Sequence, residues 1–96
     1  MAEHVLKTLA DYWDAVARGE KNFEVRRDDR GFQKGDVLVL RRMEWRERLM
    51  GRKELVETRD NLSNARREIR RKVTYVLTGG QLGIEPGYVV LGLKKA

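Results

Sequence analysis

The stretch Val37-Leu38-Val39-Leu40 decides the fold of this sequence. Four apolar residues in a row, bounded by turn residues, are typical of a strand that is buried on both faces. The preceding Lys34-Gly35-Asp36 supplies the turn. We therefore expect a buried strand at 37–40 and look for its partners on either side.

Alternation with period two predicts those partners. In 22–26, Phe23 and Val25 face one side while Asn22, Glu24 and Arg26 face the other. Apolar and polar residues also alternate over 69–77, before Thr78-Gly79-Gly80 ends the run. A last strand is expected at 88–93, with a bulge or close approach at Gly92. The segment 4–7 is either a short strand or an anchored N-terminus.

One helix is expected between the segments 4–7 and 22–26. Thr8 is a favourable N-cap residue, with Asp11 three positions later, and Gly19 is a favourable C-terminal stop. The apolar positions recur at helical spacing: Leu9, Tyr12, Trp13 and Val16. The sequence therefore predicts a helix over 8–18.

Together these elements indicate an α+β protein. Its 96 residues form one domain, because a second core would not fit. About five strands and one good helix are most economically arranged as a small closed or nearly closed sheet, which removes exposed edges. We expect a β-barrel of about five strands with one or two flanking helices.

The positive charge is concentrated in one third of the chain. The net charge is +6, and residues 41–72 contain 12 Lys and Arg against 6 Asp and Glu. Such a segment is either an electrostatic footprint for phosphate or a solvated, charge-laced helix or loop. Within it, 44–60 is predicted as a helix or a mobile excursion, because apolar and long side chains approximate a helical stripe: Trp45, Leu49, Arg52 and Val56.

Composition excludes several classes of site. The chain has no Cys and one His, which rules out disulfide frameworks, thiolate zinc sites and cysteine nucleophiles. We expect no metal and no cofactor.

No apolar run approaches the ~20 residues of a membrane span, and the N-terminus lacks the basic-then-apolar order of a signal peptide. The expectation is a cytoplasmic monomer with no membrane association.

Three pieces of the sequence resemble the ASCH domain family of the PUA-like superfamily, in particular its short bacterial and phage proteins of the DUF3850 type. Residues 19–26 are similar to the motif G-x-K-x-x-E-x-R, and residues 32–38 to F-x-x-G-D-x-L. Residues 73–80 with 83 and 87–91 are similar to the closing strands of the phage-type group. Residues 43–65 look like a basic insertion into the single ASCH-like domain that spans 1–96.

The resemblance implies a small β-barrel with a cleft lined by the Lys-x-x-Glu-x-Arg segment, and it implies nucleobase or RNA binding. A related branch of small bacterial proteins hydrolyses N4-acetylcytidine, which is an amidohydrolase activity. That branch carries a threonine nucleophile where this chain has Glu24. Hydrolysis here would therefore need another nucleophile.

The candidate site consists of Lys21, Glu24 and Arg26. Lys21 would act as a base or charge stabiliser, Glu24 would orient or activate water, and Arg26 would hold a pyrimidine carbonyl. Glu24 and Arg26 share one strand face, about 7 Å apart. The alternative is a surface ion-pair trio that binds nothing.

Four further residues are candidates for substrate binding. Tyr75 or Tyr88 could stack a base, Thr78 with the two glycines after it could hold an anion through backbone N–H groups, and Glu85 could add a second carboxylate. Each also has an ordinary reading, as packing residues or as a turn.

The leading hypothesis is a metal-independent amidohydrolase that deacylates N4-acylated cytidine or deoxycytidine. The alternative is a non-catalytic RNA-binding module, in which the cleft reads a base and the basic segment follows the phosphates. A third possibility is a phage-type accessory protein whose excursion binds a protein partner.

Overall fold

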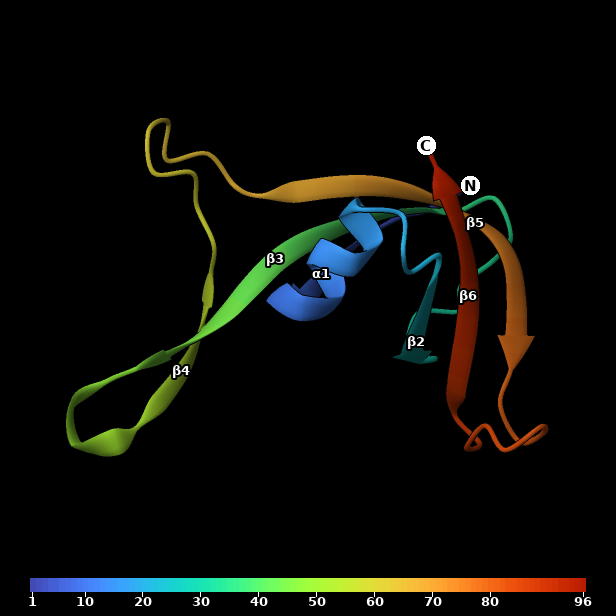
Figure 1. Cartoon of the computed structure of the whole chain (residues 1–96). Helices are drawn as coiled ribbons and strands as arrows, with labels where there is room; N and C mark the ends of the chain where they lie inside the picture. Colours follow the sequence, from blue (N-terminus) through green and yellow to red (C-terminus); the bar gives the residue numbers. More distant parts are fainter.

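A six-stranded sheet organises the chain in the computed structural model, which describes residues 1–96 (Figure 1). In chain order the elements are β1 (Glu3–Leu9), α1 (Ala10–Ala17), β2 (Phe23–Arg27), β3 (Val37–Glu47), the 3-10 turn η1 (Leu49–Gly51), β4 (Lys53–Glu57), β5 (Glu68–Thr78) and β6 (Tyr88–Lys95). The single helix is too short and too polar to cross a membrane.

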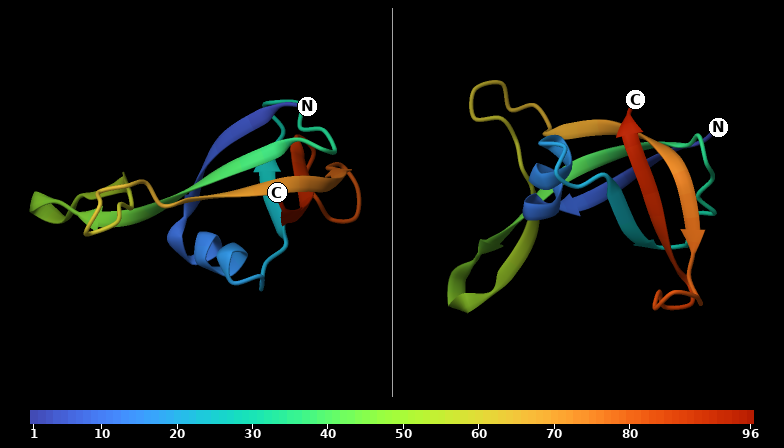
Figure 2. Two further views of the ribbon diagram at one scale, coloured as in Figure 1. Left: turned by 90° about the horizontal axis from the view of Figure 1, so that it is seen from above. Right: turned by 45° about the vertical axis from the view of Figure 1, so that its right-hand side comes forward.

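The sheet is open. Its strand order is β1-β3-β5-β6-β2, with β4 added to the outer half of β3. The β1–β3 pair is parallel and every other pair is antiparallel. The sheet curves strongly, so that α1 lies against its hollow side (Figure 2). The α+β class is confirmed, but β1 and β2 form no backbone ladder with each other, so six strands make an open sheet in place of a closed barrel of five.

The core lies where α1 meets the inner faces of the central strands. Ten residues form it: Leu6, Trp13, Val16, Phe32, Leu38, Leu40, Val73, Val89, Leu91 and Leu93. Trp13 also donates a hydrogen bond from its indole nitrogen to the backbone carbonyl of Leu40, at 2.8 Å. Because a buried indole N–H needs an acceptor, this bond fixes α1 over β3.

The predicted strands are confirmed, three of them with small shifts of their bounds and the one at 37–40 with an extension to Glu47. The run 37–40 is the buried start of β3, where Leu38 and Leu40 are fully buried. The alternating segments 22–26, 69–77 and 88–93 correspond to β2, β5 and β6. The close approach at Gly92 is also confirmed: the β5–β6 register shifts opposite it, and a Cβ there would lie 2.7 Å from Thr74 Oγ1.

The predicted N-cap is wrong. Thr8 belongs to β1, which continues to Leu9, and the helix begins at Ala10 without a side-chain cap. The hydroxyl of Thr8 accepts a hydrogen bond from Arg26 on β2. The tertiary contact outcompetes the local capping pattern, so α1 spans Ala10–Ala17 in place of 8–18.

The predicted helix over 44–60 is also wrong. This segment is a β-hairpin made by the outer half of β3, η1 and β4, and it projects away from the rest of the molecule (Figure 1). We call residues 45–57 the arm. Trp45 faces Leu55 across the two strands. The four residues that approximated a helical stripe lie on both strands of the hairpin and at its tip: Trp45, Leu49, Arg52 and Val56.

Candidate functional site

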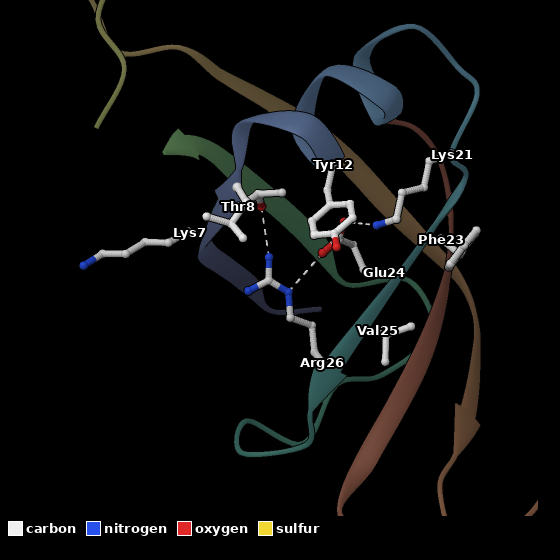
Figure 3. Close-up of a pocket in the computed structure, with 9 residues that line it drawn as sticks. Lys7, Thr8, Tyr12, Lys21, Phe23, Glu24, Val25 and Arg26 are labelled. Carbon is white, nitrogen blue, oxygen red and sulfur yellow. Dashed lines mark hydrogen bonds and ion pairs between the residues drawn. The ribbon is translucent and has the colours of Figure 1, made fainter. Parts of the chain in front are cut away.

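A cleft of about 560 Å³ lies between the two end strands of the sheet. Nine residues line it, from the end of β1, the first turn of α1, the segment leading into β2 and β2 itself: Lys7, Thr8, Leu9, Tyr12, Lys21, Phe23, Glu24, Val25 and Arg26 (Figure 3). The three residues of the Lys-x-x-Glu-x-Arg segment thus lie in one cleft.

Strand β2 has the reverse of the usual polarity for a sheet strand. Glu24 is 3% exposed and Arg26 is half-buried, whereas Phe23 and Val25 are 42% and 51% exposed. Burying a carboxylate is unfavourable unless it is paired and hydrogen-bonded. A strand that turns its charged face inward and its apolar face outward is therefore a candidate functional element.

Glu24 is held between two cations. Its Oε1 accepts a hydrogen bond from Lys21 Nζ at 2.8 Å, and its Oε2 accepts one from Arg26 Nε at 3.0 Å (Figure 3). The side chains of all three are largely shielded from water. Charge-assisted bonds of this kind fix the position of a carboxylate and compensate for its loss of hydration.

The turn after α1 brings Lys21 to Glu24. Gly19 has a φ of 79°, which favours glycine, and the amides of Glu20 and Lys21 both bond to the carbonyl of Ala15. Lys21 therefore lies outside the alternation of β2 and converges on Glu24 from the helix side.

Two aromatic rings flank the Lys21 ammonium. Its Nζ lies 5.3 Å from the ring centre of Tyr12 and 5.1 Å from that of Phe23. Both rings are partly exposed, at 56% and 42%. Cations over aromatic faces are attracted to the ring quadrupole, so the rings and the ammonium hold one another in place at the mouth of the cleft.

The third contact of the network joins β2 to β1. Arg26 donates from Nη2 to the hydroxyl of Thr8 at 2.9 Å. Thr8 is 3% exposed. The guanidinium thus uses one N–H on Glu24 and one on Thr8, and its planar fork is fixed in orientation.

Several hydrogen-bonding positions in the cleft are free. A guanidinium has five N–H donors and an ammonium has three, so Arg26 retains three and Lys21 retains two. A carboxylate has about four lone-pair sites, of which Glu24 uses two. The lining carries three cations and one carboxylate. The cleft is therefore suited to a planar ligand that is rich in acceptors and has one donor.

The other predicted binding residues lie elsewhere. Tyr75 is 65% exposed on β5, and Tyr88 stacks with Arg27, whose guanidinium carbon is 5.5 Å from its ring centre. Thr78 and Glu85 lie at the β5–β6 connection, where the Thr78 hydroxyl contacts Gln81. The structure brings none of these four into the cleft.

The backbone amides after Thr78 are not available to an anion. The amide of Gly79 donates to the carbonyl of Tyr88, and that of Gly80 donates to the carbonyl of Ile84, both at 2.7 Å. The predicted anion site at 78–80 is therefore corrected to a hydrogen-bonded turn.

Sequence reasoning missed four polar or aromatic members of the cleft: Lys7, Thr8, Tyr12 and Phe23. Thr8 resembled a helix cap and Tyr12 resembled part of a buried helix face. The sequence offers only the alternation over 22–26, which puts Glu24 and Arg26 on one face, and it does not say which face is inward. The structure exposes Phe23 and Val25, so the same alternation buries Glu24, which then needs polar partners. No group of three or more acidic or His side chains is arranged to hold a metal ion.

Two comparisons found known sequences that are similar to this chain. Residues 3–93 match the family described as "Domain of unknown function (DUF3850)". Over 42 residues the chain is 43% identical to an uncharacterized 12.9 kDa protein in the GpA 3' region of Escherichia phage P2. That match covers 44% of this chain and 37% of the phage protein.

Proposed function

This chain belongs to the DUF3850 family, and we propose that its cleft binds a nucleobase of the cytosine type, as a nucleoside or within RNA. The observation that carries the proposal is the buried Lys21–Glu24–Arg26 network, in which a single carboxylate is framed by cations with unused donors. The resemblance of its motifs to ASCH domains supports the same proposal.

The chemistry of cytosine complements these free positions. Its exocyclic N4–H group is a donor that a free lone pair of Glu24 can accept. Its carbonyl oxygen and ring nitrogen are acceptors for the remaining N–H groups of Arg26 and Lys21. The faces of Tyr12 and Phe23 beside Lys21 offer apolar surface to a flat ring.

Hydrolysis of an N4-acyl group is the second candidate function. It is favoured by the position of Glu24, which has unused lone pairs beside the Lys21 ammonium. In this reaction Glu24 takes a proton from water as the oxygen attacks the amide carbonyl carbon, and Lys21 stabilises the resulting oxyanion. The C–N4 bond then breaks, the proton passes to N4, and cytidine and a carboxylic acid leave.

Equilibrium binding of nucleosides tests the first function. We expect saturable binding of cytidine and N4-acetylcytidine, and a 10- to 100-fold loss of affinity for Arg26→Ala, since a hydrogen bond to a charged group contributes roughly 1.5–3 kcal/mol. Arg52→Ala is the matched control, because Arg52 lies on the arm and makes no side-chain hydrogen bond or ion pair. Equal affinities for both variants and the parent protein would contradict the proposal.

Turnover distinguishes the second function from the first. Incubation with N4-acetylcytidine, followed by ultraviolet absorbance, should show cytidine if the cleft is catalytic. Glu24→Gln keeps the shape of the side chain but removes the base, and should lower kcat by about 10²–10⁴-fold. Binding without turnover in the parent protein leaves the binding function and rejects the hydrolase.

A further inference from the structure

A second, apolar hollow adjoins the cleft. It has a volume of about 310 Å³ and is lined by Leu9, Ala10, Asp11, Met43, Glu44 and Trp45. Leu9 lines both the hollow and the cleft, so a surface track leads from the candidate base site onto the root of the arm. Leu9 and Met43 are direct neighbours across the parallel β1–β3 pair.

Trp45 is the large aromatic side chain on this track. It follows Met43 by two residues on β3, so the two share one face of the sheet. Trp45 is 59% exposed although its cross-strand neighbour Leu55 packs beside it. An indole with this exposure is a ready stacking surface for a base.

Cations lie at both ends of the track. Lys7 shares the face of Leu9, makes no ion pair, and extends outward from the mouth of the cleft (Figure 3). Lys53 shares the face of Leu55 and Trp45 and also makes no ion pair. Three acidic residues, Asp11, Glu44 and Glu47, stand beside the track, and Glu44 is paired with Arg42. The surrounding segment 41–72 carries twice as many basic as acidic groups.

From these placements we infer that the ligand of this surface is single-stranded nucleic acid, with one base in the cleft and a nearby base stacked on Trp45. This inference rests on the proposed function, and it names a polymer as the ligand of the same site. The strand geometry puts Trp45 about 8 Å from Leu9, which is roughly two stacked nucleotide steps. The backbone passes Lys7 at one end and Lys53 at the other.

A single strand fits the track better than a duplex does. The bases of a duplex are stacked and paired, so neither the cleft nor an exposed indole can reach a base face. In a single strand every base has an accessible face, and stacking on an aromatic side chain combined with basic contacts is the usual mode of binding.

Tryptophan fluorescence gives a direct test, because Trp13 is buried and Trp45 is the exposed tryptophan. A pentanucleotide of cytidines should bind more tightly than cytidine and should quench the fluorescence of Trp45. Trp45→Ala should weaken pentanucleotide binding by about 5- to 100-fold, as expected for one stacked base, and should leave cytidine binding unchanged. Trp45→Phe should restore most of the affinity, and Leu62→Ala, at an exposed position on another loop, is the control.

Charge variants test the path of the backbone. Lys7→Ala and Lys53→Ala should each reduce the slope of log K against log salt by about 0.7, the value for one phosphate contact on a single strand. Asp11→Asn should strengthen pentanucleotide binding, because it removes a negative charge beside the track.

The outcomes separate this inference from the proposed function. If cytidine binds and the pentanucleotide binds no more tightly, or if Trp45→Ala weakens both ligands equally, the nucleic-acid path is wrong and the base site stands. If Trp45 instead contacts a protein, the pentanucleotide should likewise bind no more tightly than cytidine. If neither cytidine nor the pentanucleotide binds, the proposed function itself fails.

Discussion

Arg26 on β2 donates a hydrogen bond to the hydroxyl of Thr8 on β1 at 2.9 Å, and this bond links the two strands at opposite ends of the sheet path. No backbone ladder joins β1 to β2, so side chains bridge the gap where a closed barrel would have continued its hydrogen bonds. The gap is also where the cleft lies. The open sheet therefore creates the site, and the Thr8–Arg26 contact sets its width.

Thr8→Val tests this contact. The substitution keeps the shape of the side chain but leaves one N–H group of Arg26 without its acceptor, which should reduce the free energy of unfolding by about 1–2 kcal/mol. Nucleoside affinity should fall as well, because the guanidinium loses its fixed orientation. Thr8→Ser retains the hydroxyl and should behave as the parent protein does in urea denaturation and in binding. Equal stability of the Val and Ser variants would argue against the bridge.

Arg42 is predicted to be the anchor of the arm. It forms a paired contact with Asp14 on α1, at 2.9 and 3.0 Å, and further bonds to Glu44 and to the hydroxyl of Thr58. The hydrogen bond from Arg42 is the main reason that the pKa of Asp14 lies below its usual value, and it outweighs the opposing effect of burial. Arg42→Ala should lower the free energy of unfolding by about 1–3 kcal/mol, because the two carboxylates lose their shared cation.

Hydrogen exchange provides the specific readout for that variant. The amide of Thr58 donates to the carbonyl of Arg42 at the root of the arm, so its exchange should accelerate more than that of core amides. Arg41→Ala is the matched control, since Arg41 makes one ion pair at a more exposed position. Uniform acceleration throughout the sheet would show that Arg42 supports the fold as a whole and not the arm in particular.

Asp36 is predicted to make stability depend on acid pH. Burial raises its pKa, but hydrogen bonds from the amide of Gln33, the ring of His4 and the amide of Ala2 together hold the pKa below its usual value of 3.8. A lowered pKa in the folded state means that Asp36 contributes stability above about pH 4 and loses it as the pH falls through the folded value.

Urea denaturation of Asp36→Asn across pH 2.5–7 checks this prediction. The variant should be less stable by roughly 1–3 kcal/mol at neutral pH, since the carboxylate accepts several hydrogen bonds. The difference between variant and parent should shrink as the pH falls below about 4. Asp28→Asn, on the exposed turn after β2, is the control. A difference that stays constant to pH 2.5 would contradict the linkage.

Gly79 is predicted to be intolerant of any side chain. A Cβ at this position would lie 2.1 Å from the carbonyl oxygen of Glu85 and 2.6 Å from that of Tyr88, and both are backbone atoms that cannot move independently. Gly79→Ala should lower the free energy of unfolding by at least about 2 kcal/mol. Gly83→Ala in the same loop meets no atom within 4 Å and should cost only about 1 kcal/mol of backbone strain at its φ of 75°. Thermal unfolding of the two variants makes the comparison.

The strands could be predicted from the sequence because their side chains alternate, or are uniformly apolar, over runs such as 22–26 and 37–40. Local patterns failed where a tertiary partner decided the outcome. Thr8 is a good cap by local rules, yet Arg26, 18 residues away, takes its hydroxyl. The arm has no apolar alternation, because it is exposed on most of its surface, so the period that identifies a strand is missing there.

That Lys21, Glu24 and Arg26 share one cleft could also be predicted, because they lie within six residues of one another. The other residues that line the cleft could not be predicted. Tyr12 and Lys7 lie in the cleft because β1 and β2 are at the two ends of the sheet, and Tyr75 and Glu85 lie outside it because of the same strand order. Strand order depends on long-range pairing, which a local pattern does not encode.

The outer arm is predicted to be dispensable for folding. Arg46 and Glu54 form a cross-strand pair, and beyond them the tip residues Leu49 and Met50 are 90% and 97% exposed. Replacing residues 47–53 by Asn-Gly should close the hairpin with a two-residue turn of a favourable type. The truncation keeps Trp45 and the anchor at Arg42, so the melting temperature should change by no more than a few degrees.

Ligand binding of the truncated chain gives the second readout. Cytidine affinity should be unchanged, because every residue that lines the cleft is retained. Pentanucleotide binding should lose about 0.7 from its salt slope with the removal of Lys53, and it should keep the quenching of Trp45. Circular dichroism and thermal melting establish that the shortened chain is folded before binding is measured. If it does not fold, the hairpin beyond Arg46 belongs to the folding unit, and its exposure is not a sign that it serves a ligand.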